Sequence, residues 1–395
     1  FSVGYGSLKF NLTGCSNVAI GLNSLQANQN GHHNIAIGCN SLYSNTGGCY
    51  NIALGPYALC CNTTGNNNTA IGNQALRFNT SGFDNVAIGV NALSCNNTGN
   101  MNIAIGDQAM YNNLYGNNNT ALGCHALQLN VCGCNNIAIG LCSLYANTGS
   151  ANIALGINTL KANTYGNNNT AIGCAAMYGN TTGCGNVAIG YQSLLCNSGG
   201  THNVGLGCNT VKCNTTGINN IGVGAAALAN NITGSNNVAM GFFALINNNV
   251  GNNNFAVGCA AMQANTYGSN NFAVGGYALR CNTTGCYNVA IGNCALWCNL
   301  SGIGNFAVGN MAMYCNSGTY NIAVGYCTLW NNQTGNNNIA LGAYGLTCNV
   351  SGSNNIAFGR TALYCNCASN NVAMGCTALR NNTTGTNNFA VGAGA

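Results

Sequence analysis

The sequence predicts an all-β fold, a parallel β-solenoid (a β-roll or β-helix) of about 24 coils with a 17-residue period. Three observations lead to this prediction. One short motif recurs at nearly constant spacing along the whole chain, and within it apolar and small residues alternate as they do in a strand. Asn and Gly also recur at fixed offsets, where turns are required.

The recurring motif is Asn-Φ-Ala-Φ-Gly, in which Φ is apolar or threonine. It forms residues 68–72 and returns seventeen residues later as residues 85–89. Its glycine, taken as position 0 of each coil, occurs in 24 copies. The spacing is 17 residues except for three 16-residue intervals, which end at Gly156, Gly325 and Gly375. Because no linker interrupts the copies, we expect residues 1–395 to form a single continuous repeat array.

The motif is expected to form the strand of each coil, because it is rich in Val and Ile and alternates with period two. We expect the large residues at −3 and −1, together with Leu, Met or Val at +4, to point inward as the core. Ile71, Ile88 and Ile105 are one such stack. The 16-residue intervals are expected to lack one turn residue, since loss of a strand residue would exchange the two faces.

Position −2 is Ala, Ser or Gly in all 24 copies, although solvent would accept any polar residue there. Two explanations are open. A tight coil has no room for a larger group, or the outer face packs closely against a second layer or another copy of the chain. We favour the packed outer face.

Asn occupies positions −4 and +7 in all 23 copies that contain each position. Stacked Asn side chains can hydrogen-bond one another along the array, so an asparagine ladder is predicted. Twelve of the +7 residues also lie in Asn-X-Ser/Thr triplets. Turn chemistry explains these triplets as well as N-glycosylation does. The candidate glycosylation sites are Asn62, Asn180, Asn214, Asn282 and Asn382.

Position +5 varies freely and carries six of the seven basic residues and eight aromatic residues, so it is predicted to point outward. An ordinary solvated ridge explains this composition, and so does a track that binds an anionic or sugar polymer such as a polysaccharide. The candidate binding stripe consists of Tyr43, Arg77, Tyr111, Tyr145, Lys161, Tyr178, Trp297, Tyr314, Trp330 and Tyr364.

The 26 cysteines gather at particular positions of the coil, nine of them at +6. Residues at the same position in adjacent coils are about 4.8 Å apart, within the Cα range for a disulfide. Disulfide staples and small apolar filler are both open explanations. The candidate disulfide residues are the same-position sets Cys196 and Cys213, Cys281, Cys298 and Cys315, and Cys348 and Cys365, and the Cys-X9-Cys pairs Cys39 and Cys49, Cys124 and Cys134, and Cys174 and Cys184.

Composition excludes several classes of function. Asp84 and Asp107 are the only carboxylates, which leaves acid–base catalysis almost nothing to work with, so we expect no enzyme, no catalytic residue and no cofactor. Four histidines and no Cys-X2-Cys pair predict no metal site. The net charge of +5 is too dilute for nucleic-acid binding, and no apolar run is long enough for a membrane span. Abundant cysteine favours an oxidising, extracellular setting.

The motif at residues 85–89 and 186–190, Asn-Val-Ala-Ile-Gly, resembles the head repeats of YadA-like trimeric autotransporter adhesins. Residues 67–76, Asn-Asn-Thr-Ala-Ile-Gly-Asn-Gln-Ala-Leu, are similar to repeats of phage-type tail-fibre proteins. The resemblance spans the chain and implies a left-handed parallel β-roll, often trimeric, in an adhesive head or a fibre shaft. The 17-residue coil is longer than the usual head repeat.

Together these features predict a structural subunit of an extracellular filament, fibre or sheath. The array begins inside one motif and stops just after another, so we expect it to polymerise end to end through uncapped solenoid edges, with other copies of itself as partners. The alternative is a trimeric adhesin head or a phage or viral tail-fibre shaft at a cell or virion surface. An ice-binding solenoid is disfavoured, because Thr is irregular outside the turns.

Overall fold

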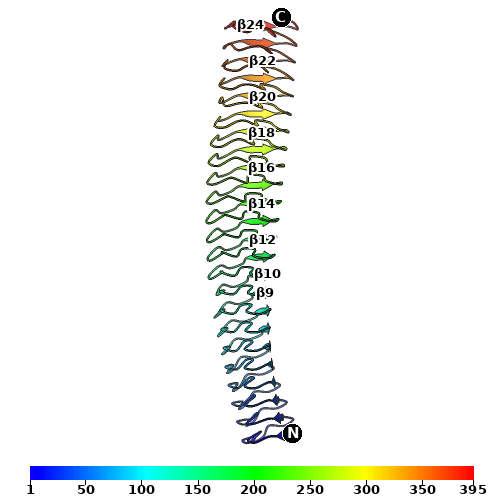
Figure 1. Ribbon diagram of the computed structural model, residues 1–395, viewed down its shortest axis with the longest axis vertical. Coiled ribbons are helices and arrows are strands. Elements are labelled where there is room, and N and C mark those ends of the chain that lie inside the picture. The colour runs from blue at the N-terminus through cyan, green and yellow to red at the C-terminus, as the bar shows by residue number, and fades with distance from the viewer. The chain divides into compact units, whose positions relative to one another are not determined.

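The computed structural model describes residues 1–395, which form two compact units, Phe1–Gly200 (unit 1) and Thr201–Ala395 (unit 2). Each unit is a parallel β-solenoid in which every coil contributes one short strand at the same place (Figure 1). The predicted fold class is therefore confirmed. The structure has no helix long and apolar enough to cross a membrane.

All strands but the first are three residues long. The strands of unit 1 are β1 (Ser2–Val3), β2 (Val18–Ile20), β3 (Ile35–Ile37), β4 (Ile52–Leu54), β5 (Thr69–Ile71), β6 (Val86–Ile88), β7 (Ile103–Ile105), β8 (Thr120–Leu122), β9 (Ile137–Ile139), β10 (Ile153–Leu155), β11 (Thr170–Ile172) and β12 (Val187–Ile189). The strands of unit 2 are β13 (Val204–Leu206), β14 (Ile221–Val223), β15 (Val238–Met240), β16 (Phe255–Val257), β17 (Phe272–Val274), β18 (Val289–Ile291), β19 (Phe306–Val308), β20 (Ile322–Val324), β21 (Ile339–Leu341), β22 (Ile356–Phe358), β23 (Val372–Met374) and β24 (Phe389–Val391).

Within each unit, every strand pairs in parallel with the next strand in the sequence. Ala70 of β5 lies opposite Ala87 of β6, seventeen residues later. The register survives a 16-residue interval, since Ala138 of β9 lies opposite Ala154 of β10. The missing residue is in the turn: Asn130 bonds the carbonyl three residues ahead, whereas Asn147 bonds the carbonyl two residues ahead. The interpretation of the short intervals as turn deletions is confirmed.

The prediction that positions −3 and −1 form the core is wrong, because the strand faces the other way. Ala104 at −2 is completely buried, whereas its neighbours Ile103 and Ile105 are 40% and 38% exposed. The interior holds Ala at −2, a small residue at +3 and one large residue at +4, such as the fully buried Leu76. A coil this narrow has no room for large residues on the strand's inner face. The small size at −2 therefore reflects the tight coil, and the favoured packed outer face at −2 is also wrong.

The predicted asparagine ladder is present, and it is double. At position −4, Nδ2 of Asn85 donates to Oδ1 of Asn68 at 3.1 Å and to the Gly99 carbonyl at 2.8 Å. At position +7, Nδ2 of Asn79 donates to Oδ1 of Asn62 at 2.8 Å. Most residues of both ladders are fully buried, so the amide bonds satisfy polar groups that water does not reach.

Close stacking of the coils explains the motif glycine. Gly106 has φ +135°, and a Cβ there would lie 2.7 Å from the backbone carbon of Gly123 in the next coil. The turn that follows contains two left-handed residues in each coil, as at Gln74 (φ 60°) and Leu76 (φ 50°). Left-handed Leu is uncommon and costs about 1–2 kcal/mol, which burial of its side chain in the core offsets.

Candidate functional site

The outward side of the strands in each unit is an apolar surface that repeats from coil to coil. We define the apolar strand face as the residues at −3 and −1 of β2–β12 in unit 1 and of β13–β24 in unit 2. These side chains are half-buried or exposed throughout, and no charged residue interrupts them. Only Thr69, Thr120 and Thr170 are polar.

Sequence reasoning missed this face because it assigned the same residues to the core. The range of side-chain sizes at each position could have indicated which side of the strand faces outward. Position −3 accepts residues from Thr to Phe, and the rings of Phe255 and Phe272 stack with centroids 4.9 Å apart. A close-packed interior does not accept such a range, whereas position −2 is restricted to the smallest residues.

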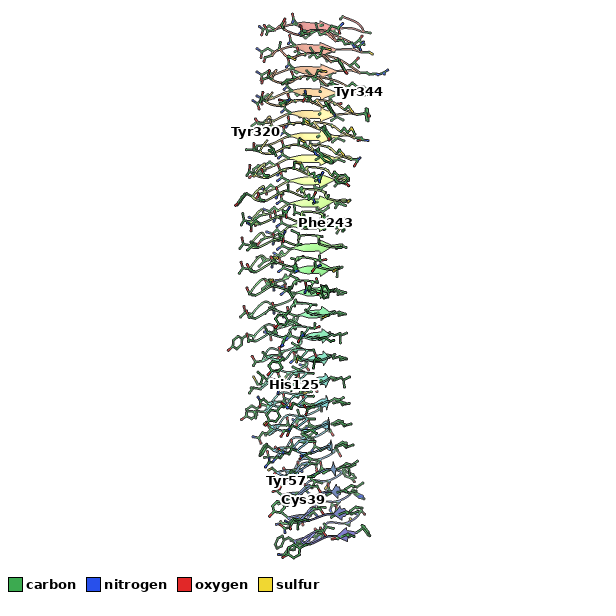
Figure 2. The ribbon with its side chains drawn as sticks, viewed as in Figure 1. Cys39, Tyr57, His125, Phe243, Tyr320 and Tyr344 are labelled. Atoms are coloured by element: carbon green, nitrogen blue, oxygen red, sulfur yellow. The ribbon has the colours of Figure 1, made fainter.

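The ten residues of the candidate binding stripe at position +5 are each half-buried or exposed, although Ser94, Ala229 and Thr347 at the same position are buried. The stripe consists of Tyr43, Arg77, Tyr111, Tyr145, Lys161, Tyr178, Trp297, Tyr314, Trp330 and Tyr364. Figure 2 shows the side chains around each unit, with Tyr320 and Tyr344 of unit 2 on opposite sides of the strands. Small hollows beside the stripe are open to solvent; Tyr43, Tyr57 and Cys60 line one, and Tyr178 and Leu195 another.

In unit 2 the stripe becomes a continuous ring stack. The guanidinium of Arg280 lies 4.8 Å from the Trp297 ring centroid, and the ring centroids of Trp297, Tyr314 and Trp330 follow at 5.6 Å intervals. These rings turn their faces to one another, so mainly their edges remain for a ligand. Sugar recognition by stacking uses ring faces, so this geometry favours a stabilising ladder over a polysaccharide track, and polysaccharide binding stays a prediction.

Two sets of candidate disulfide cysteines in unit 2, the cysteine columns, hold position +6 in successive coils: Cys281, Cys298 and Cys315, and Cys348 and Cys365. The Cys298 thiol interacts electrostatically with its neighbours Cys281 and Cys315, and the Cys348 thiol with Cys365. All five are thiols in this structure. Burial, with the neighbouring thiols, raises the pKa of Cys281, Cys298 and Cys348 above the ordinary value. Disulfide stapling of these columns stays a prediction.

The other predicted pairs have different surroundings. In the Cys-X9-Cys pairs the second sulfur bonds its own turn: Cys49, Cys134 and Cys184 each donate to the carbonyl two residues earlier, at 3.4 Å. The first cysteine of each pair, Cys39, Cys124 or Cys174, lies at position +1, just after the motif glycine. Cys196 belongs to unit 1 and Cys213 to unit 2.

The candidate glycosylation sites are ladder residues. The Nδ2 atoms of Asn62, Asn180 and Asn282 each donate to the preceding ladder asparagine and to a glycine carbonyl. Asn214 is buried and bonds Gly217, and the half-buried Asn382 bonds Asn366 and Gly385. A glycan on this nitrogen would remove a ladder hydrogen bond, so attachment would have to precede folding.

Four further thiols, Cys60, Cys95, Cys124 and Cys294, have raised pKa values. Burial, together with the neighbouring Cys61, raises the pKa of Cys60 from 9.0 to about 11, although the Arg77 charge acts in the opposite direction. Burial and the charge of Asp107 raise the pKa of Cys124. Cys124 also belongs to the one group of side chains, with Asp107 and His125, whose chemistry and spacing suit a metal ion.

Comparison of the chain with protein-family models, with curated proteins and with solved structures finds no match.

Proposed function

We propose that the protein is a non-catalytic structural subunit of an extracellular filament, fibre or sheath, and that copies associate side by side through the apolar strand face. The apolar strand face is the observation that carries the proposal. Monomeric soluble proteins rarely expose contiguous apolar patches above about 300–600 Å². Here every strand from β2 to β12 and from β13 to β24 presents two outward side chains, nearly all of them apolar.

A second copy of the same chain is the occupant that fits this face best. Its strands repeat at the same spacing of about 4.8 Å, so ridges on one copy meet grooves on the other at every coil. Sheets of this kind pack about 10 Å apart with dry, interdigitated side chains. The face is also uncharged, so no ionic group loses its hydration on contact.

An extracellular setting is part of the proposal, on the strength of the cysteine columns. Cys281, Cys298 and Cys315 hold the same position in successive coils, and their thiols interact electrostatically. In an oxidising environment adjacent pairs could close into disulfides and harden the array. The low content of charged residues, seven basic and two acidic, agrees with a surface that is mostly covered in the assembled state.

The alternative is a trimeric adhesin head or a tail-fibre shaft, in which the same apolar face closes around a three-fold axis. The resemblance of the repeats to those families supports this alternative. In a closed trimer the apolar strand face of each chain is buried at the trimer interface, so assembly stops at three chains.

Electron micrographs and light scattering of the purified full chain distinguish the two forms. The proposal expects laterally associated fibres whose mass rises with protein concentration. A particle of fixed three-chain mass would support the adhesin alternative instead. A monomer at all accessible concentrations would contradict both.

A further inference from the structure

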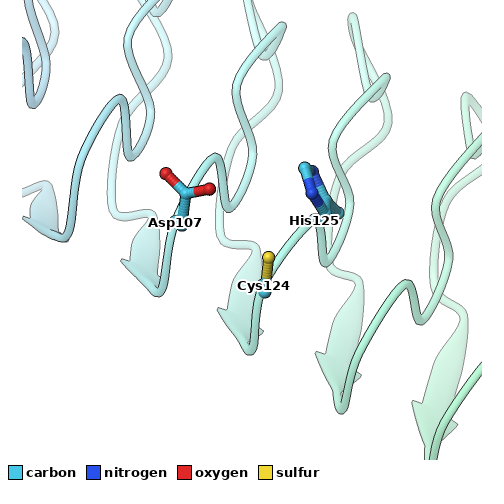
Figure 3. A group of neighbouring side chains, drawn as sticks. All are labelled: Asp107, Cys124 and His125. Atoms are coloured by element: carbon cyan, nitrogen blue, oxygen red, sulfur yellow. The ribbon is translucent and has the colours of Figure 1, made fainter.

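Three side chains of different chemistry meet in unit 1, at the carboxyl ends of two adjacent strands. Asp107 follows β7, and Cys124 and His125 follow β8, each just beyond the motif glycine. One ligand atom from each residue lies within 4.8 Å of the other two. Figure 3 shows the three side chains on the same side of the turns that carry them.

The solenoid holds these residues together through its backbone. β7 and β8 are in register, with Ile105 opposite Leu122, so the turns that follow lie one above the other. The backbone nitrogen of His125 donates to the Asp107 carbonyl at 3.0 Å. The site is therefore built on stacked coils and needs no mobile loop to assemble it.

The repeat does not require Asp at +1 or His at +2, and both residue types are rare in the chain, although Cys is common at +1. The whole chain has two carboxylates and four histidines, and one of each meets a cysteine here. Elsewhere the same places in the coil hold other residues, such as Asn73 at +1 and Asn91 at +2. Nothing in the folding of the coil accounts for the combination.

The histidine supplies an independent observation. Its Nδ1 atom is buried and has no hydrogen-bond partner. A buried polar nitrogen without a partner costs free energy, and coordination is one way in which imidazole is satisfied. Asp107 is exposed, so an ion can reach the group from solvent.

We propose that Asp107, Cys124 and His125 bind one divalent transition-metal ion of the zinc class. Thiolate, imidazole and carboxylate are the ligands that zinc takes in proteins. Three protein ligands leave the fourth tetrahedral position open to water. The ion links two adjacent coils, and on binding the Cys124 thiol releases its proton to solvent as the sulfur–metal bond forms.

The site can be tested with zinc ions alone on the full-length chain, kept reduced by a phosphine. The readout is the rate at which an alkylating reagent modifies individual cysteines, measured by peptide mass spectrometry. Cys174 is the internal control, because it holds the same +1 position but is followed by Ala175. We expect stoichiometric zinc to slow modification of Cys124 at least tenfold and to leave Cys174 unchanged. Equal effects on both cysteines would overturn the proposal.

Variants test the other two ligands without disturbing the coil. Asp107→Asn and His125→Asn introduce the residue that the array already uses at +1 and +2, and Asn tolerates the left-handed φ of 57° at His125. Each should abolish most of the zinc protection of Cys124, whereas the matched Asp84→Asn should retain it. Full protection in both ligand variants would refute the site.

Cobalt provides a second readout, since thiolate coordination gives a charge-transfer absorption. In Cys124→Ala we expect this absorption to fall by the amount that one bound cobalt ion contributes. Alanine is a suitable replacement because the repeat already holds it at +1, as Ala225 and Ala343. An unchanged cobalt spectrum in that variant would place the binding at other cysteines and overturn the proposal.

Discussion

At the scale of single residues, the buried asparagines connect the sequence most directly to the fold. A typical ladder asparagine both donates and accepts between coils, and its amide also bonds a turn carbonyl. Nδ2 of Asn96 donates to Oδ1 of Asn79 at 2.7 Å, and Nδ2 of Asn79 donates to Asn62 and Gly82. The ladder satisfies the interior polar groups that a coil this narrow cannot expose to water.

Asn79→Ala should therefore destabilise the protein. It leaves buried groups of Asn62, Gly82 and Asn96 short of a partner, at a cost on the order of 3 kcal/mol. Chemical denaturation of the variant would measure this loss. The matched change Asn73→Ala removes an exposed amide and should alter stability by less than about 0.5 kcal/mol. Equal stability of the two variants would contradict the ladder's role.

The Cys60 thiol makes stability depend on alkaline pH. Its pKa is raised from 9.0 to about 11, so the folded state holds the proton more tightly than the unfolded chain does. The stabilisation is complete below pH 9 and is lost as the pH rises towards 11. The melting temperature should fall over this interval, and Cys60→Ser should reduce the fall. A fall of the same size in the variant would show that other groups cause it.

Some of these residue roles were predictable and some were not. Invariant Asn at −4 and +7 predicted the ladder. Side-chain amides can hydrogen-bond one another along the array when Asn holds the same position in successive coils. The left-handed conformation of Leu76 was not predictable, because leucine rarely adopts a positive φ and nothing in the sequence indicates that it does so here. The group around His125 was missed because its members are close only across coils and lack the short spacing of known metal motifs.

At the scale of elements, every strand after β1 is a three-residue segment, and its orientation decides which residues are on the surface. The period and the turn residues predicted where the strands lie and how they pair. They did not predict which face is inside, because alternation of period two is unchanged when the two faces are exchanged. The narrow interior settles the question by admitting only Ala, Gly or Ser at −2.

Two neighbouring residues of β6 test this orientation. Ala87→Phe places a large ring in a fully closed interior and should cost several kcal/mol or prevent folding. Val86→Phe on the outer face should change stability by less than about 1 kcal/mol, since −3 already holds Phe in β16 and β17. Urea midpoints of the two variants give the comparison. A larger loss for Val86→Phe would show that the strand faces the other way.

At the scale of the whole molecule, composition predicted a structural role, because two carboxylates and four histidines leave little for catalysis. The apolar strand face could not be located from sequence, because the inward and outward assignments were exchanged. The structure moves the candidate contact from the small residues at −2 to the large ones at −3 and −1. The account therefore depends on the apolar strand face being the contact between copies.

Sedimentation equilibrium of the full chain and a triple variant tests that claim most directly. Ile35→Thr, Ile103→Thr and Ile137→Thr make the face more polar with the residue that −3 already holds in β5, β8 and β11. The matched control, Tyr115→Thr with Tyr165→Thr, removes exposed apolar side chains away from the strands. The account predicts that the wild type and the control associate at micromolar concentration and that the triple variant associates at least tenfold more weakly. Equal association of all three proteins, or a wild type that stays monomeric, would contradict it.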